Sequence, residues 1–392
     1  MIHRLVYTEQ LPTLVLVALG ASETIVGLQR AFQPFAQLLQ LATMRTVGRL
    51  RKRSILVSGQ VVAILGGLPL VAFGTLATTE PPWPVTITLA SLIVVAAGIV
   101  ASDTVWFPLL RGYVEPDRVG HFFGLVRTAW HLTLIGYFIG AQRWLAAWPG
   151  SFGPLFAAAT AGGLVRIALV SRLPEAPTQE GERVRVREAL ALLAKEPRLR
   201  RYLYGVSLSG AARRAVVPFV IVMMRRVMGL SAAAVLLTTV AYFAGGFVSL
   251  YLWGRTIDRF GPQPVFRVTA VGSALLYVAL LGVEEGSGAV GPMVGFFFLL
   301  SVLSSGFGVA DTHVLFGLAP VHAPTRLLVV ADVTSSLGYG LAPVAAGFGL
   351  DAALAGGVDA LAAYRSLFII ASLATLLSLL PLRGFGRAVS TR

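Results

Sequence analysis

Long apolar stretches alternate with short polar segments along the whole chain. A helix that spans a membrane needs about 20 mostly apolar residues, because the hydrocarbon core of a bilayer is about 30 Å thick. The recurring alternation of apolar and polar residues that is typical of outer-membrane barrels is absent from the sequence. We therefore expect an all-α integral membrane protein with twelve transmembrane helices, the first of them short, near 5–21, 24–45, 54–77, 85–110, 122–146, 153–172, 202–224, 231–253, 264–283, 289–318, 327–350 and 361–382.

The composition agrees with this expectation and excludes several kinds of chemistry. Of the 392 residues, 56% are hydrophobic and 13% are charged, whereas soluble proteins have roughly 25% charged residues. The chain has no cysteine, which excludes disulfides, thiolate metal sites and cysteine nucleophiles. The sequence also shows no Walker motif and no nucleophile–base or metal-ligand constellation. We therefore expect neither an enzyme nor a bound cofactor or metal.

The positive charges are distributed unequally between the two sides of the predicted membrane. The formal net charge is +14, which by itself would fit a nucleic-acid-binding protein. If the N-terminus is cytoplasmic, however, 23 of the 32 Lys and Arg residues fall in inner segments, and two, Arg225 and Arg226, fall in outer loops. This positive-inside bias predicts a multi-pass protein of the cytoplasmic membrane with both termini in the cytoplasm. The insertion of the chain in a lipid bilayer, with basic residues on the cytoplasmic side, explains the net positive charge. We therefore do not expect nucleic acid as a partner.

A polar segment divides the twelve spans into two sets of six. Pro174 and Pro177 open it as a linker, and Val186, Leu190 and Leu193 then recur at helical spacing among Arg and Glu residues. This pattern indicates an amphipathic helix at the cytoplasmic interface. We expect an N-terminal six-helix bundle at 1–172, a cytoplasmic linker at 173–201 and a C-terminal six-helix bundle at 202–392.

An internal repeat relates the two halves. Six residues of spans 4 and 10 and of the loops that follow them recur at a constant offset of 208: Gly98, Asp103, Thr104, Leu110, Pro116 and Arg118 match Gly306, Asp311, Thr312, Leu318, Pro324 and Arg326. An offset of six spans leaves both halves in the same orientation, so the repeat is parallel. Halves of this kind are related by an axis along the membrane normal and rock around a site at mid-membrane.

Three motifs resemble loops of the major facilitator superfamily. Gly254-x-x-x-Asp258-Arg259-x-Gly261, after span 8, resembles its signature loop. Pro116-Asp117-Arg118-Val119-Gly120 resembles its loop after helix 4, and Pro197-Arg198-Leu199-Arg200-Arg201 resembles the start of its helix 7. The resemblance implies the fold of this superfamily over the whole chain. It also implies gate roles for Gly254, Asp258, Arg259, Gly261, Arg118 and Arg326.

The sequence departs from the signature loop in both halves. Gly48 stands where the first-half motif would have its Asp, and Gly261 is followed by Pro262 rather than by a basic residue. In the superfamily this Asp is thought to hold a cytoplasmic latch. One hypothesis is a charge-swapped latch between Asp332, near the inner end of span 11, and the basic cluster at 49–53. The alternative is that Asp332 complements the N-terminal dipole of span 11.

Charges inside spans are costly and mark candidate functional positions. Arg213 and Arg214 lie near the middle of span 7, and the helical step of about 100° keeps them from facing one direction. We expect one to face the cavity and recognise a carboxylate or phosphate of the substrate, and the other to face a neighbouring span. The alternative is a buried pairing with an acid of span 1, 4 or 10. Arg30 in span 2 is expected to snorkel or to form an ion pair.

Four acidic or histidine residues are candidates for proton coupling. Asp103 and Asp311 occupy equivalent positions about two turns from the inner surface, where burial would favour reversible protonation. Their alternative role is an inner gate formed with Arg111, Arg118 or Arg326. His313 is a candidate proton relay. Glu9 becomes a candidate coupling acid if span 1 continues upstream of Met1, and its alternative role is a solvated residue near the inner surface. The short first span fits either a start upstream of Met1 or a shortened span.

Together these features predict a secondary active transporter that moves a small organic solute across the cytoplasmic membrane by alternating access. We expect a monomer coupled to protons, as a symporter or an antiporter. The arginine pair favours an anionic or amphipathic solute, and efflux is as compatible with the sequence as uptake. The alternative is a transporter-like protein that no longer transports and serves as a membrane sensor or an assembly partner.

Overall fold

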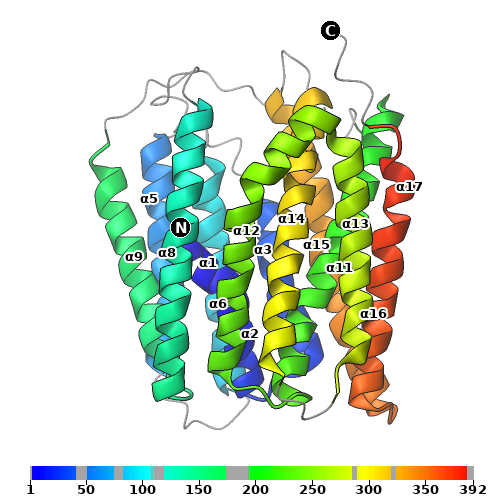
Figure 1. Ribbon diagram of the computed structural model, residues 1–392. Coiled ribbons are helices and arrows are strands. Elements are labelled where there is room, and N and C mark those ends of the chain that lie inside the picture. Colours follow the sequence, from blue (N-terminus) through cyan, green and yellow to red (C-terminus); the bar gives the residue numbers. More distant parts are fainter. Residues whose placement is uncertain are drawn as a thin grey trace.

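The computed structural model describes residues 2–40, 51–74, 83–106, 109, 119–173, 193, 195–284, 289–318 and 324–385. Within these ranges every regular element is a helix (Figure 1). The helices are α1 Ile2–Thr8, α2 Gln10–Ala18, α3 Glu23–Gln37, α5 Lys52–Phe73, α6 Trp83–Thr104, α8 Val119–Ala147, α9 Gly153–Ser171, α11 Pro197–Arg226, α12 Ala232–Phe260, α13 Pro262–Ala279 with the 3-10 turn Leu280–Gly282, α14 Val290–Leu318, α15 Pro324–Ala355, α16 Ala360–Leu377 and α17 Leu379–Leu382.

Twelve helical segments follow one another through the described ranges, if α1 and α2 count as one segment and α17 as the end of α16. Nine of the described helices are long and apolar enough to span a membrane. The all-α prediction is confirmed, and the helices lie where the sequence placed its spans. α11 begins at Pro197, inside the segment that the sequence assigned to the linker. The amphipathic linker helix predicted around Val186 lies outside the described residues.

Capping residues and one glycine fix the ends of several helices. Ser231 precedes α12, and its Oγ accepts a hydrogen bond of 3.1 Å from the backbone N–H of Ala234. Asp359 caps α16 in the same way through the N–H of Ala362, at 3.0 Å. Gly261 separates α12 from α13 with a φ of +76°, a conformation that residues with a Cβ rarely adopt. The last glycine of the signature-like motif is therefore required by the turn itself.

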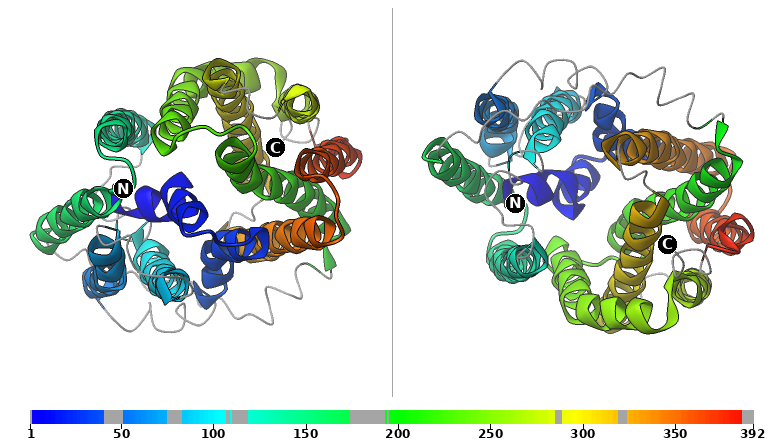
Figure 2. Two further views of the ribbon diagram at one scale, coloured as in Figure 1. Left: turned by 90° about the horizontal axis from the view of Figure 1, so that it is seen from below. Right: turned by 90° about the horizontal axis from the view of Figure 1, so that it is seen from above.

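The helices form two bundles, α1 to α9 and α11 to α17, which lie side by side when viewed along their axes (Figure 2). The bundles meet mainly where α3 packs on α15 and where α8 packs on α12. Glycines bring α3 and α15 into backbone contact. A Cβ added to Gly27 would lie 2.2 Å from the carbonyl oxygen of Pro343, and one added to Gly347 would lie 2.4 Å from that of Glu23. Only residues without a side chain allow this approach.

The outward surface of the bundles is apolar. Leu65 of α5, Leu275 of α13 and Ile370 of α16 have exposed fractions of 58%, 63% and 64%. A soluble monomer rarely exposes so many large apolar side chains together. Lipid tails would cover these side chains, which agrees with the spans predicted from the sequence.

The first span is broken near its centre. The sequence predicts one short helix here, but Glu9 separates α1 from α2 with φ −93° and ψ −139°. The N-terminal end lies about half-way along the height of the bundle (Figure 1). Within a membrane, interrupted helix backbone is tolerated where it is buried in protein or lines a cavity, and broken helices contribute to the binding sites of many transporters. The break therefore marks a place to look for a functional site.

Candidate functional site

Arg30 of α3 reaches the break in the first span. Its Nη1 atom donates a hydrogen bond of 2.8 Å to the carbonyl oxygen of Thr8, the last residue of α1. Its Nε and Nη2 atoms are buried and have no hydrogen-bond partner among the described residues. Glu9, Arg214 and Tyr242 interact with this guanidinium electrostatically. Arg30 thus belongs to the centre of the molecule, where its charge meets residues of both bundles.

The two arginines of α11 point in different directions, as the helical step requires. The guanidinium of Arg214 lies over the ring of Tyr339 in α15, 4.7 Å from the ring centroid, and interacts electrostatically with Glu9 of the other bundle. Arg213 lines a small polar cavity inside the C-terminal bundle, with Ser209, Thr269, Ser273, Tyr277, Ser304, Phe307 and Thr375. Arg214 is therefore the one directed toward the N-terminal bundle, and Arg213 the one directed toward neighbouring spans.

Arg30, Arg213 and Arg214 form a central arginine cluster near the middle of α3 and α11. Acids from three helical segments interact electrostatically with these guanidinium groups. Glu9 interacts with Arg30 and Arg214, Asp311 with Arg213, and Asp332 with Arg214. The unpartnered N–H groups of Arg30 lie beside the broken helix. A carboxylate or a phosphate is the ligand whose oxygen atoms match such groups, because it can accept two parallel hydrogen bonds.

Asp103 and Asp311 each bind the first span of their own bundle. Oδ2 of Asp103 lies 2.8 Å from Nη1 of Arg4 in α1. Oδ1 of Asp311 accepts a hydrogen bond of 2.6 Å from the hydroxyl of Tyr202 in α11. Both contacts therefore join span 4 or span 10 to the first span of its bundle, through partners of different kinds. The partners considered from the sequence, Arg111 and Arg118, lie outside the described residues, and the side chain of Arg326 is not described.

Asp332 lies on α15 with an exposed side chain. Arg214 and Arg4 interact electrostatically with its carboxylate, so these charged partners lie on α11 and α1. The proposed latch partner Arg49 lies outside the described residues. Arg53 donates hydrogen bonds to the carbonyl groups of Ser171 and Leu173, the latter at 2.9 Å. The charge-swapped latch stays a hypothesis.

The signature-like loop lies at the junction of α12 and α13. Asp258 and Arg259 are exposed in the last turn of α12, and the guanidinium of Arg259 lies 5.1 Å from the ring centroid of Phe260. A Cβ added to Gly254 would meet open space. The motif thus forms the turn expected of it, and its gate role stays a prediction.

Two histidines within the spans differ in their surroundings. His313 is half-buried on α14, two residues after Asp311. His131 of α8 is buried, donates through Nδ1 to the carbonyl oxygen of Arg127 at 2.8 Å and packs edge-on against Phe243 of α12. His131 is therefore part of the contact between the bundles, and His313 remains the candidate relay.

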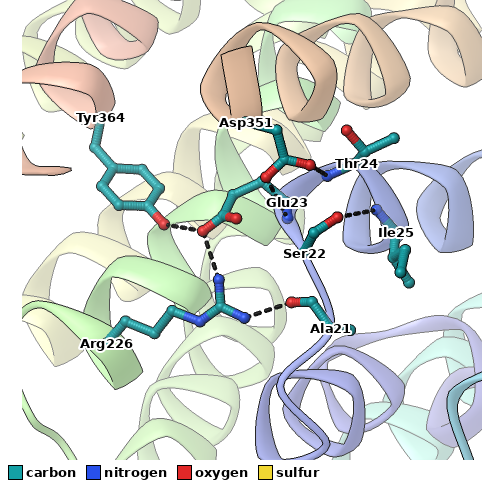
Figure 3. A network of polar contacts seen from close by, with 8 residues as sticks. All are labelled: Ala21, Ser22, Glu23, Thr24, Ile25, Arg226, Asp351 and Tyr364. Atoms are coloured by element: carbon teal, nitrogen blue, oxygen red, sulfur yellow. Dashed lines mark hydrogen bonds and ion pairs between the residues drawn. The ribbon is translucent and has the colours of Figure 1, made fainter. Parts of the chain in front are cut away.

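A polar network joins the two bundles at the end assigned to the outside (Figure 3). Oε1 of Glu23, in the first turn of α3, lies 2.6 Å from Nη1 of Arg226 at the end of α11 and accepts a hydrogen bond of 2.8 Å from the Tyr364 hydroxyl of α16. Arg226 also donates to the carbonyl oxygen of Ala21. Asp351 of α15 accepts from the backbone N–H groups of Glu23, at 3.1 Å, and Thr24, at 2.8 Å. We call these four residues, Glu23, Arg226, Asp351 and Tyr364, the outer network.

The outer network marks the closed end of the interface. α11 contacts both α2 and α3 on this side, and the side chain of Glu23 is 5% exposed. Among the described residues, α6 and α14, which carry Asp103 and Asp311, make no extended contact with each other. With the orientation given by the positive-inside bias, the structure is closed toward the outside. Sequence reasoning missed Glu23 and Tyr364, although an acid in the first turn after Ser22 is a visible N-terminal signal.

Comparison with solved structures identifies the architecture. The nucleoside transporter NupG is 11% identical, with a TM-score of 0.72 over 98% of this chain and 96% of that chain. A D-xylose-proton symporter is 16% identical, with a TM-score of 0.71 over 99% and 95% of the two chains. A point mutant of the E. coli fucose:proton symporter FucP is 16% identical, with a TM-score of 0.58 over 98% of each chain.

The chain has the major facilitator fold. The prediction of two six-helix bundles in a parallel repeat is therefore confirmed. No protein-family model and no curated protein matches the sequence. Identities of 11–16% to proteins with the major facilitator fold establish the fold, and the central arginine cluster and the outer network are features of this chain.

Proposed function

We propose that the protein is a secondary active transporter of a small organic anion that works by alternating access between its two bundles. The observation that carries the proposal is the central arginine cluster, in which Arg30 has two buried donors without a partner among the described residues. Charged side chains within a membrane are costly and persist where they are paired or functional. A carboxylate or phosphate of the substrate would supply the missing acceptors.

The similar structures support transport as the function. They belong to a nucleoside transporter and to two proton symporters, one for D-xylose and one for fucose. The solutes of those proteins are not transferred to this chain, because the likeness concerns the fold. The three arginines favour an anion instead.

We place proton coupling at Glu9 and Asp311. Glu9 lies at the helix break and interacts with Arg30 and Arg214, so an anion that binds these arginines competes with its carboxylate. Displacement of the Glu9 carboxylate from these arginines would link binding of the anion to this acid, which is the coupling that a proton-driven transporter requires. Asp311 interacts electrostatically with Arg213 in the C-terminal bundle, and His313, two residues further on, is its proposed relay.

The decisive experiment is flux into proteoliposomes that contain the purified protein and an imposed pH gradient. The solutes to test are short and long carboxylates, organic phosphates and cationic dyes. We expect uptake of an anion that depends on the gradient and is lost in Arg214→Ala. Arg143→Ala, an exposed arginine on α8, is the matched control. Absence of flux for every class of solute would refute transport, and equal flux in Arg214→Ala would refute anion recognition.

The sign of the pH dependence separates uptake from efflux. Stimulation of anion entry by external acid indicates symport, whereas exit of the anion driven by proton entry indicates an antiporter that performs efflux.

We further infer that the protein is a monomer in the cytoplasmic membrane. Both termini are expected inside, following the positive-inside bias. Mass measurement in detergent and accessibility of a C-terminal tag test these two points.

A non-transporting sensor or assembly partner is the second candidate. It is favoured by Gly48, which replaces the acid of the first-half signature loop. Such a protein would still bind the anion at the central arginine cluster. Stabilisation by an anion without flux, in liposomes that hold folded protein, would point to this alternative.

A further inference from the structure

A groove on the side of the C-terminal bundle that faces away from the N-terminal bundle is separate from the central arginine cluster. It is a cavity of about 430 Å³ between α13 and the end of α16 and α17, lined by Gln263, Arg267, Val271, Leu379 and Arg383. Figure 2 places α13 and α16 at the edge of the bundle that faces away from α1 to α9. The groove therefore opens toward the surroundings of the protein, which in a membrane are lipids.

Two arginines give the groove a positive end. Arg267 and Arg383 are exposed, and the residues that line the groove include no acid. Arg201 adds a third guanidinium nearby, since its Nη2 donates a hydrogen bond of 2.9 Å to the carbonyl oxygen of Arg383. An exposed guanidinium pair at one cavity is suited to bind a phosphate group through charge-assisted hydrogen bonds.

Beside the arginines and Gln263, the groove is lined by two apolar side chains, Val271 of α13 and Leu379 of α17. Exposed apolar side chains continue beyond the groove on the same helical segments: Leu275, one turn after Val271, and Leu376, one turn before Leu379, have exposed fractions of 63% and 40%. These side chains lead from the arginines toward the middle of the bundle. A ligand that fills the groove therefore needs a phosphate at one end and a hydrocarbon chain at the other.

The depth of the arginines fits the headgroup layer of the inner leaflet. Arg267 lies in the second turn of α13, and Arg383 directly follows α17. Both are thus at the end of the bundle that the positive-inside bias assigns to the cytoplasm. Basic pockets between membrane helices on this side bind the headgroups of acidic lipids.

We propose that this groove is a binding site for an anionic phospholipid of the inner leaflet. The phosphate binds Arg267 and Arg383, and an acyl chain lies along Val271 and Leu379 and continues past Leu275. Free inorganic phosphate could use only the arginine end, so the apolar walls favour the lipid. The site does not depend on whether the protein transports an anion at its centre.

The test measures lipid binding to the full-length protein in a neutral detergent. Native mass spectrometry and thermal unfolding are recorded with phosphatidylglycerol, with phosphatidylcholine of the same chains, and with inorganic phosphate. We expect phosphatidylglycerol to bind at least about tenfold more tightly than phosphatidylcholine and to raise the melting temperature, as a ligand of the folded state does. Inorganic phosphate should give no such shift.

Variants decide whether the groove is responsible. Arg267→Ala combined with Arg383→Ala should abolish the preference for phosphatidylglycerol, while Arg200→Ala combined with Arg255→Ala, exposed arginines at the same end, should keep it. If the double variant does not fold, the single variants Arg267→Ala and Arg383→Ala are measured instead. Each should weaken the preference for phosphatidylglycerol over phosphatidylcholine severalfold. An unchanged preference in these variants would overturn the proposal. An equal response to inorganic phosphate would also overturn it, because the site would then bind a small anion.

Discussion

The guanidinium of Arg226 lies 2.6 Å from the carboxylate of Glu23 and ties the end of α11 to the start of α3. The two residues belong to different bundles, and their side chains are 31% and 5% exposed. Alternating access requires the bundles to separate at this end. Opening toward the outside must therefore break this ion pair, together with the bonds that Tyr364 and Asp351 make to the same segment.

Glu23→Gln should shift the population toward the outward-open state. The substitution removes the charge but keeps the shape, and a lost coupling of about 1–3 kcal/mol corresponds to a roughly 5–150-fold shift between the states. The chain has no cysteine, so cysteines introduced at the outer ends of α2 and α11 can carry spin labels without background. Distances between the labels should lengthen.

Tyr364→Phe provides a graded control for this prediction. It removes one neutral donor to Glu23 and leaves the ion pair, so it should cost only about 0.5–1.5 kcal/mol and shift the distances less. Identical distance distributions in wild type and Glu23→Gln would show that the outer network does not hold the gate.

Arg30→Ala should weaken binding of the transported anion. Loss of hydrogen bonds to a charged group costs about 1.5–3 kcal/mol, which corresponds to a roughly 10–150-fold higher Kd. Isothermal titration with the anion found in the flux screen measures the change. Arg30→Lys should restore the charge but not the paired hydrogen bonds, so it should recover only part of the affinity. Wild-type affinity in Arg30→Ala would remove Arg30 from the site.

Asp103 and Arg4 should be energetically coupled in a double-mutant cycle. Asp103→Asn and Arg4→Gln each break the 2.8 Å contact, and the double variant should be less harmful than the sum of the two. A coupling of about 0.5–1 kcal/mol is expected, because both side chains are partly exposed, at 22% and 32%. Thermal unfolding of the four proteins in one detergent measures it. Strictly additive effects would argue against a direct ion pair.

Gly27→Leu should block the close packing of α3 on α15. Its side chain would clash with the backbone of Pro343, and overpacking of this kind costs about 1–3 kcal/mol. The melting temperature and the flux should both fall. Gly136→Leu is the matched control, because a Cβ at Gly136 on α8 meets open space. Equal losses in the two variants would show that the effect arises from general helix damage.

The fold could be predicted from the sequence because its main determinants are local and periodic. Apolar stretches of span length predicted the helices, and the offset of 208 between Asp103 and Asp311 indicated the parallel repeat. The orientation predicted from the sidedness of arginine stays a prediction. Each of these two aspartates contacts the first span of its own bundle, which agrees with a parallel repeat.

The candidate site could be predicted only in part, because its partners come from distant segments. The helical step was enough to separate Arg213 from Arg214. It could not show that Arg30 lies beside a broken helix, although Pro12 is a local signal for the break, because its missing N–H leaves the carbonyl of Thr8 without a helical partner. The outer network was missed for a similar reason: Glu23 and Arg226 lie 203 residues apart, and each has an ordinary local explanation at a helix end.

The position of Asp351 has a consequence for measuring the transport cycle. Its carboxylate caps the first turn of α3 from the opposite bundle, through the amides of Glu23 and Thr24. When the bundles part, these amides lose their acceptor and become open to water. Their hydrogen–deuterium exchange should then report how often the gate opens in the unlabelled protein, at two known backbone atoms and without any engineered probe.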